Sequence, residues 1–314
     1  MSHMGFDTTW IGWIMKCVES VSFFVLVNGT PTGYIQPSRG IRQGDPLSLY
    51  LFILCSEVLS HLLTNASTVN RLRGMKISNT GPTINHLLFA DDALFFCNAH
   101  QKSCSTIMRI LKEYEHVSGQ AVNLHKSITF GSRVKPEVKT RLRLILNIHN
   151  DGGYGRYLGL PEQIGRIQIE VFDFIVKQVQ QRTQGWTTKF LSQAGKEILI
   201  KTVALALPVY TMNCFKLPKG PCDDINRLLA QYWWSNGPDK RSMHWLSWKR
   251  MALPKQEGGL GFRDIESFNM AMLGKQAWRI LQSPNSLLSR LLRGRYFAST
   301  SLLNAETGTK PSFI

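Results

Sequence analysis

The sequence lacks several features that mark secreted, zinc-binding and membrane-spanning proteins. None of its six cysteines belongs to a Cys-x-x-Cys pair, so no structural zinc site is expected. No positively charged segment followed by an apolar run opens the chain, as it would in a signal peptide. No apolar run reaches transmembrane length without interruption, so no membrane contact is expected. These absences favour free thiols in a reducing, intracellular compartment, for which the nucleus and organelles such as the mitochondrion are both suitable.

Acidic residues are scarce, and the shortage is uneven along the chain. The sequence has 37 Lys and Arg against 21 Asp and Glu, a formal net charge of +16. Residues 1–130 carry 10 basic and 8 acidic residues, whereas residues 131–314 carry 27 and 13. Lys and Arg neutralise the phosphates of a bound nucleic acid, and a generic solvated basic surface is the alternative. The first interpretation predicts salt-sensitive nucleic-acid binding by residues 131–314.

Two adjacent carboxylates, Asp91 and Asp92, stand between two short apolar runs within residues 86–96. Each run is typical of a mostly buried strand, and Ala-Asp-Asp is typical of a tight turn between them. A carboxylate beside buried strands needs a partner, and Asp oxygens are ligands that Mg²⁺ prefers. Asp91 is the better candidate ligand, because neighbouring strand residues point to opposite faces and only the turn could bring Asp92 alongside. An ordinary turn rich in Asp is the alternative.

A loop with two glycines precedes this hairpin and leads into Asp45-Pro46. Asp is a good N-cap and Pro suits the first helical turn, so a helix is expected to begin here. Residues 49–63 are apolar almost all round, which predicts a buried helix. A phosphate or a base could approach the helix N-terminus, although a surface loop capping a core helix is the alternative. The candidate nucleotide- or template-binding residues are Arg39, Gly40, Arg42, Gln43, Gly44, Asp45 and Pro46.

The order and the sequences of these two segments resemble those of the reverse transcriptases of plant non-LTR (LINE-type) retrotransposons. In that family the segment Arg-Gly-x-Arg-Gln-Gly-Asp-Pro-Leu-Ser handles template and nucleotide, and Phe-Ala-Asp-Asp is the catalytic hairpin. The resemblance continues through residues 114–127, 157–161, 191–201, 233–248, 258–262 and 275–279. It implies an RNA-directed DNA polymerase that uses Mg²⁺ or Mn²⁺ in a two-metal reaction. Its implied partners are an RNA template, a DNA primer and dNTPs.

The resemblance also assigns roles to single residues. It makes Asp91 and Asp92 the metal ligands, and Lys126 a group that stabilises the triphosphate or protonates pyrophosphate, with an ordinary exposed Lys as the alternative. It makes three residues the primer grip: Tyr157, Leu158 and Gly159. The family's other metal-binding Asp is expected on a palm strand that precedes residue 1. Asp7 is a less favoured candidate for that role than for the start of a helix.

Two hypotheses therefore stay open. The first is a fragment of a reverse transcriptase, impaired as an isolated chain, in which another chain could supply the missing palm strand. The second is an inactive retroelement remnant that at most binds RNA or DNA through its basic C-terminal half. A maturase-like splicing cofactor would share the palm and thumb.

The expected fold is α+β: a partial palm with an antiparallel sheet at 1–161, a helical thumb-like region at 162–220 and a basic, Trp-rich helical region at 221–314. A hairpin is expected around Asn28-Gly29, between strands at 22–27 and 32–35. Strands are also expected at 84–89, 93–97 and 122–130, and helices at 8–18, 103–117, 168–182, 192–207, 222–234 and 265–282. Ser103 is the expected cap of the helix at 103–117, and Gly119 lies just past its end. Most tryptophans are expected in the core, with Trp245 and Trp248 as the exceptions.

Overall fold

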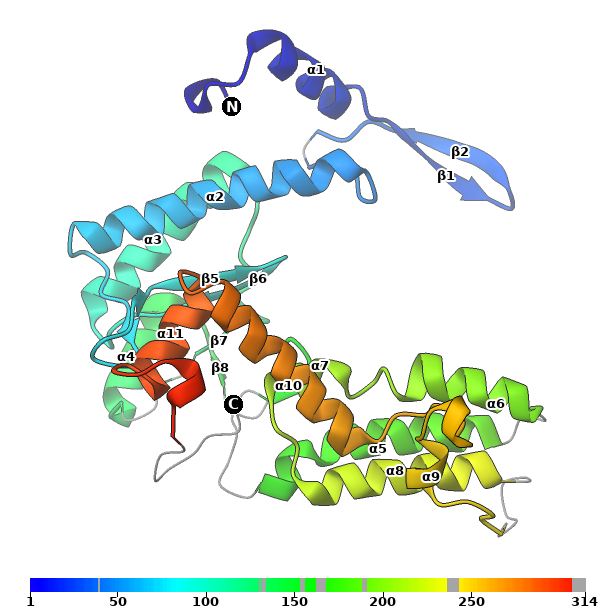
Figure 1. Ribbon diagram of the computed structural model, residues 1–314. Helices are drawn as coiled ribbons and strands as arrows, with labels where there is room; N and C mark the ends of the chain where they lie inside the picture. Colours follow the sequence, from blue (N-terminus) through cyan, green and yellow to red (C-terminus); the bar gives the residue numbers. More distant parts are fainter. Residues whose placement is uncertain are drawn as a thin grey trace. The chain divides into compact units, whose positions relative to one another are not determined.

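The computed structural model describes residues 1–38, 40–129, 131, 134–152, 156–161, 168–187, 191–235 and 243–306. Helices and short strand pairs make up the chain (Figure 1), which confirms the α+β class. The chain divides into two compact units. The first consists of residues 1–76 and 83–151, and the second of residues 77–82 and 152–314. The division into palm, thumb-like and C-terminal regions stays a prediction.

The first unit contains four α-helices and the short 3₁₀ helix η1 (Ser2–Met4) among its described residues. The α-helices are α1 (Thr8–Glu19), α2 (Pro46–Thr68), α3 (Gln101–Ser118) and α4 (Pro136–Leu146). Asp45 caps α2 as expected, because its carboxylate accepts a hydrogen bond from the Leu47 N–H at 2.8 Å. Helix α3 ends at Gly119, whose φ is +72°. The prediction that Ser103 caps α3 is wrong: the N-cap residue is His100, and Ser103 is buried in the first turn.

The described strands of the first unit form separate two-stranded sheets rather than one continuous sheet. Three pairs are antiparallel: β1 (Phe23–Val27) with β2 (Thr30–Ile35), β3 (Met75–Lys76) with β4 (Thr83–Ile84), and β5 (His86–Phe89) with β6 (Asp92–Phe95). The fourth pair, β7 (Ile128–Thr129) with β8 (Asn150–Asp151), is parallel. Of the predicted strand at 122–130, residue 130 lies outside the described residues, and within 122–129 only β7 is a strand, because the Lys126 and Ser127 N–H groups donate to the Asn123 carbonyl and form a turn.

The hairpin predicted around Asn28-Gly29 is confirmed. Both residues have positive φ, +52° and +81°, as a two-residue turn matched to the strand twist requires. Every residue of β1 and β2 is exposed. This hairpin therefore forms through local turn chemistry and strand pairing rather than through burial in the described unit.

The core of the first unit lies between the C-terminal half of α2 and the buried face of α3. Its residues are Leu59, Leu63, Ala66, Leu72, Ile107, Ile110, Leu111 and Tyr114. The expectation that α2 is buried is wrong for its N-terminal half, where Leu49, Tyr50 and Ile53 are 70%, 68% and 61% exposed. Within the unit only one face of α2 meets α3 and the β5–β6 hairpin. By length and composition α2 could cross a membrane, contrary to the sequence expectation, although a core helix passes the same test.

The second unit is mainly helical, with one short hairpin formed by β9 (Arg156–Tyr157) and β10 (Leu160–Pro161). The predicted helices at 168–182, 192–207, 222–234 and 265–282 are confirmed with small changes at their ends. The helical elements are α5 (Gln168–Thr187), α6 (Gln193–Leu199), the π-helical turn η2 (Ile200–Ala204), α7 (Val209–Cys214), α8 (Lys219–Trp234), α9 (Trp248–Met251), η3 (Lys255–Glu257), α10 (Ile265–Gln282), α11 (Leu287–Tyr296) and η4 (Leu302–Asn304).

One hydrophobic core runs through the second unit and includes residues on both sides of position 220. Helices α5 and α8 pack together (Figure 1) through Phe172, Ile175, Ile225 and Leu229, all at most 1% exposed. Among the tryptophans, the expectation of an exposed Trp245 is confirmed at 75% exposure. The same expectation for Trp248 is wrong: it is 7% exposed and stacks on Phe262. Trp278, which was expected in the core, is 62% exposed.

Candidate functional site

The two candidate metal ligands lie at the tip of the β5–β6 hairpin. Leu88 pairs with Ala93 and Phe89 with Asp92, so Ala90 and Asp91 form a two-residue turn. Ala90 has a φ of +50°, which such a tight turn requires. The predicted turn is confirmed, with Asp91 in it and Asp92 as the first residue of β6.

The tip of this hairpin is in solvent. Asp91 and Asp92 are both exposed, and Phe89 is 61% exposed. The expectation that these carboxylates sit between mostly buried strands is therefore wrong at the tip. Burial begins lower in the hairpin, where Leu88 and Phe95 pack on the core formed by α2 and α3.

Polar side chains fix the base of the hairpin to α2, and sequence reasoning missed them. The two imidazole nitrogens of His86 lie 2.7 Å from Asn85 Oδ1 and 3.0 Å from Ser60 Oγ. The Asn85 amide donates to the Leu63 carbonyl at 3.2 Å. Burial lowers the pKa of His86, although the Glu57 carboxylate opposes this effect. A polar pair at the start of an otherwise apolar strand was the only signal in the sequence.

The donor chemistry of the tip suits a divalent cation. Mg²⁺ keeps several waters and is usually bound through one or two carboxylates together with substrate phosphates. Asp91 and Asp92 supply two such carboxylates in a solvent-exposed position. In the described part of the chain no cluster of three or more His, Cys, Asp or Glu side chains could hold a metal. The tip therefore presents two carboxylates, which by themselves do not make a complete metal site.

Asp7 has a structural role at the start of α1. Its carboxylate accepts hydrogen bonds from the backbone N–H groups of Thr9, at 2.8 Å, and Trp10, at 3.4 Å. The Thr9 backbone hydrogen bond is the main reason that the pKa of Asp7 lies below its ordinary value. The helix-start interpretation of Asp7 is confirmed.

The glycine loop before α2 has the backbone that its sequence predicts. Gly40 and Gly44 have φ values of +89° and +87°, where a residue with a Cβ would be strained. Arg42 and Gln43 are exposed, and Pro46 is the first residue of α2. Arg39 lies outside the described residues. The loop thus presents glycine backbone and polar side chains next to the helix N-terminus.

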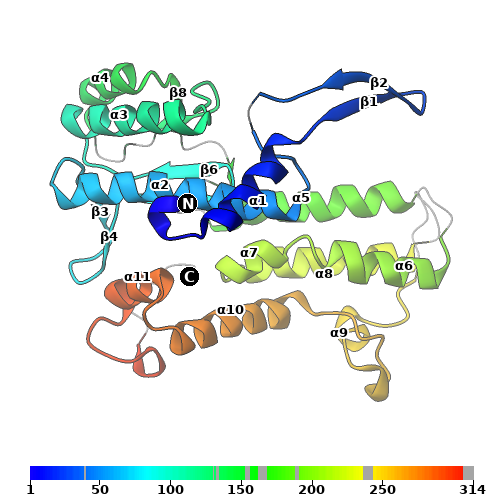
Figure 2. The ribbon, with the colours of Figure 1, turned by 90° about the horizontal axis from the view of Figure 1, so that it is seen from above.

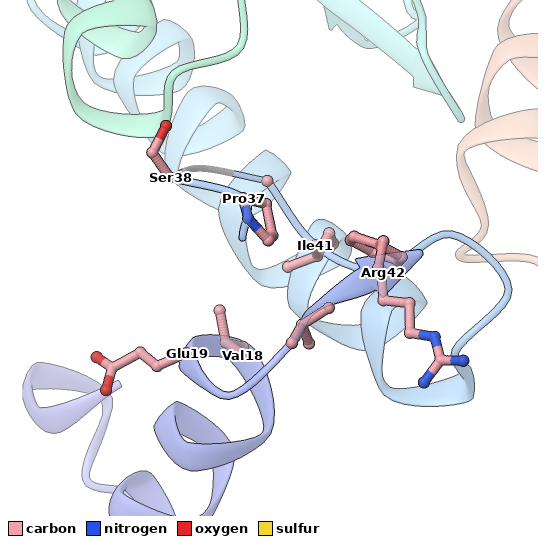
Figure 3. Close-up of a pocket in the computed structure, with 9 residues that line it drawn as sticks. Val18, Glu19, Pro37, Ser38, Ile41 and Arg42 are labelled. Atoms are coloured by element: carbon pink, nitrogen blue, oxygen red, sulfur yellow. The ribbon is translucent and has the colours of Figure 1, made fainter. Parts of the chain in front are cut away.

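A shallow cavity of about 240 Å³ lies between this loop, the end of α1 and the start of β1. Its apolar lining includes Val18, Phe23 and Ile41. In Figure 3 the side chains of Glu19 and Arg42 extend away from each other. The volume is below the roughly 300–1,000 Å³ of typical small-molecule sites, so the cavity alone does not define a nucleotide site.

The remaining candidates occupy turns in different units. Lys126 is an exposed residue of the first unit, and its N–H donates to Asn123 Oδ1 at 3.1 Å. In the second unit Tyr157 pairs with Leu160 across a two-residue turn. Leu158 and Gly159 form that turn, with φ values of +50° and +79°. The predicted primer grip is therefore a tight hairpin.

The chain matches known proteins along most of its length. The family model of reverse transcriptases (RNA-dependent DNA polymerases) matches residues 1–160 of 314. Over 110 residues, 35% of the chain, it is 46% identical to an uncharacterized mitochondrial protein of Arabidopsis thaliana and covers 71% of that protein. A second uncharacterized mitochondrial protein of this plant is 63% identical over 67 residues, which are 21% of the chain and 55% of that protein.

A more distant relative spans more of the chain. The transposon TX1 uncharacterized 149 kDa protein of Xenopus laevis is 24% identical over 272 residues, 83% of the chain but 19% of that protein. The chain thus covers 71%, 55% and 19% of these three relatives. The interpretation drawn from the Asp-Asp hairpin and the glycine loop is confirmed at the level of the family.

Proposed function

The chain belongs to the reverse transcriptase family, and we propose that it is part of a retroelement-encoded polymerase that extends a DNA primer on an RNA template. One observation carries the proposal: Asp91 lies in the exposed two-residue turn of the β5–β6 hairpin and Asp92 directly follows it, and the base of this hairpin is anchored to α2 through His86 and Ser60. Reverse transcriptases act on nucleic-acid templates and nucleotides and use divalent metals.

In this proposal Asp91 and Asp92 hold the divalent cation, Mg²⁺ or Mn²⁺. A cation bound there would activate the primer 3′-hydroxyl and stabilise the departing pyrophosphate. Exposure of both carboxylates leaves room for the cation's waters and for substrate phosphates. The anchored base of the hairpin reduces the freedom of the turn, which keeps the two carboxylates together.

The other candidates bind and orient the substrates. Arg39 and Arg42 neutralise phosphates, while Gln43, Gly44 and the Asp45-Pro46 start of α2 lie against nucleotide or template, where only glycine allows close approach. Lys126 stabilises the triphosphate or protonates pyrophosphate. Tyr157, Leu158 and Gly159 position the primer end.

The third carboxylate of a complete site comes from elsewhere in the proposed polymerase. Asp7 is engaged as the helix cap, and in the described residues no third acidic group joins Asp91 and Asp92. Another segment of a longer protein, or a second chain that adds a palm strand, would supply it. Supplying that segment in trans would then raise the activity of this chain.

Primer extension on an RNA template tests the proposal, with Mg²⁺ or Mn²⁺ and the variants Asp91→Ala and Asp92→Ala. Asp91→Ala is expected to lower the extension rate by about 100-fold or more, since transition-state charge loses its stabilisation. Asp92→Ala is expected to have the smaller effect. Asp223→Ala, which removes an exposed carboxylate from α8, is the matched control and should leave the rate unchanged.

If the isolated chain shows no primer extension, Mn²⁺ binding can be measured instead. Mn²⁺ broadens the NMR signals of nearby amides, and broadening centred on residues 90–92 that Asp91→Ala abolishes would support the metal site. Extension that persists in Asp91→Ala would contradict the assigned role. Absence of both extension and Mn²⁺ binding would favour the inactive remnant, which binds RNA or DNA at most.

A further inference from the structure

Helix α10 has one face in the core of the second unit and the opposite face in solvent. Asn269, which is 2% exposed, accepts a hydrogen bond from the Leu217 N–H and donates to the Met212 and Phe215 carbonyls. A helix advances by about 2.5 turns in nine residues, which places Trp278 opposite Asn269. Accordingly Trp278 is 62% exposed. A large planar side chain thus lies on the open face of α10 without a partner in the core.

Positive charge surrounds this indole on the same helix. Trp278 and Arg279 follow Lys275 by three and four residues. At this spacing the three side chains lie on the same part of the helix surface. Both cations are exposed, and neither forms an ion pair within the described residues. The surface formed by Lys275, Trp278 and Arg279 is called the α10 platform below.

The helix that follows is also basic. Helix α11 begins beside the end of α10 (Figure 2), where the Ser289 hydroxyl donates to the Ser283 carbonyl at 2.7 Å. It carries the exposed residues Arg290, Arg293 and Arg295. From residue 267 to residue 305 the sequence contains five Lys and Arg and no Asp or Glu. Such a run without carboxylates favours a polyanion as the ligand of this surface.

The indole and the two cations together favour a polyanion that also carries planar rings. A nucleic-acid strand carries phosphates for Lys275 and Arg279 and an exposed base that can stack on Trp278, provided that the strand is unpaired. An acidic peptide offers charge but no planar ring of this kind. We propose that the α10 platform binds a single-stranded segment of RNA or DNA, with a base stacked on Trp278. The platform lies outside residues 1–160, which the family model matches, and needs neither Asp91 nor a metal.

Fluorescence anisotropy with labelled unpaired 12-nucleotide RNA and DNA tests the proposal on the full chain. Trp278→Ala is expected to raise the Kd about fivefold or more, the size of one lost stacking contact. Lys275→Ala with Arg279→Ala is expected to reduce the slope of log K against log salt by about 1.4, since two single-strand phosphate contacts disappear. A preference for the RNA or the DNA oligonucleotide would identify which strand occupies the platform.

Matched variants separate the platform from general effects. Trp13→Ala removes an indole that is 58% exposed from α1, and Lys102→Ala with Lys112→Ala removes two exposed cations from α3. These variants should keep the wild-type Kd and slope. Equal Kd values for wild type and a folded Trp278→Ala variant would overturn the proposal. Displacement of the RNA by poly-glutamate of equal charge would also overturn it.

The outcome is independent of the polymerase proposal. Asp91→Ala should retain platform binding in full. Conversely, Trp278→Ala should retain Mn²⁺ binding at residues 90–92. Failure at one site therefore leaves the other result interpretable.

Discussion

The two units differ in how far they are held together by their own residues. Among the described residues, the main core of the first unit contains eight buried residues and that of the second contains eighteen. The first unit leaves all of β1, β2 and several large side chains of α2 exposed. The unit that contains the Asp-Asp hairpin and the glycine loop is therefore the one with less apolar burial of its own, and it would gain most from further protein or nucleic acid packed against it.

A buried ammonium group links two helices of the second unit. In the second unit the Lys196 ammonium, only 8% exposed, donates to the Trp233 and Ser235 carbonyls at the end of α8. Burial lowers the pKa of Lys196. Its hydrogen bonds satisfy carbonyls that a helix end leaves without partners. Lys196 thereby joins α6 to the end of α8.

Truncation of a core leucine should give the largest effect on stability. Leu229, which is fully buried in α8, should lose about 2–5 kcal/mol of unfolding free energy on substitution by Ala, because a cavity replaces its contacts. Leu49→Ala, at a position that is 70% exposed in α2, should change stability by less than about 0.5 kcal/mol. Urea unfolding followed by tryptophan fluorescence measures both. Equal losses would mean that α2 is covered in solution and would remove the contrast between the units.

A pair of glycine substitutions should give opposite signs within the second unit. A Cβ on Gly259 would lie 2.0 Å from the Leu253 carbonyl oxygen, so Gly259→Ala should destabilise by about 1–3 kcal/mol. Gly274 lies within α10 with nothing within 4 Å of an added Cβ, and Gly274→Ala should stabilise by about 0.5–1 kcal/mol. Thermal unfolding of both variants checks the prediction. A stabilising Gly259→Ala would show that the turn after Leu253 is not packed as described.

A smaller loss is expected at the base of the β5–β6 hairpin. Ser60→Ala removes the hydroxyl beside His86 and should cost about 0.5–1.5 kcal/mol. The amide hydrogens of residues 86–95 should exchange faster, because the hairpin opens more easily. The increase in exchange rate should correspond to the loss of free energy. Thr64→Ala, at an exposed position one turn further along α2, is the control. Unchanged exchange in Ser60→Ala would mean that apolar packing alone holds the hairpin.

Local signals in the sequence predicted several turns and helix ends of the first unit. Asn28-Gly29, Asp45-Pro46 and Gly119 each act through the conformation or hydrogen bond of a few neighbouring residues. Such effects need no knowledge of distant partners, which is why the start of α2, the end of α3 and the position of Asp91 in its turn could be predicted from the sequence.

Burial was harder to predict because it depends on distant packing partners. The apolar sequence of α2 is compatible with full burial, but Leu49, Tyr50 and Ile53 in its N-terminal half are exposed. Trp248 has basic neighbours and is nevertheless buried against Phe262. His86 and Ser60 are 26 residues apart, and no spacing rule connects them. The acidic turn was predictable, whereas its support and its exposure were not.

The smallest expected effects concern pH and one surface carboxylate in each unit. Lys139, with Arg143, holds the pKa of Asp151 below its ordinary value in the first unit, and Lys201 does the same for Glu197 in the second. Because both folded-state pKa values are depressed, each pair contributes stability above the unfolded values of about 3.9 and 4.3. That contribution is lost as the pH falls through the lower folded-state values.

Measurement of Tm between pH 2.5 and 7 therefore compares the ion pair of Asp151 in the first unit with that of Glu197 in the second. Asp151→Asn and Glu197→Gln should each flatten the fall of Tm below about pH 4, with little change in the Tm measured at pH 2.5. Glu197→Gln should have the larger effect, because Glu197 is less exposed than Asp151 and Lys201 also donates to the Leu260 carbonyl. A larger effect from Asp151→Asn would show that ion pairs matter most in the unit with the smaller core, where little else holds α4 to β8.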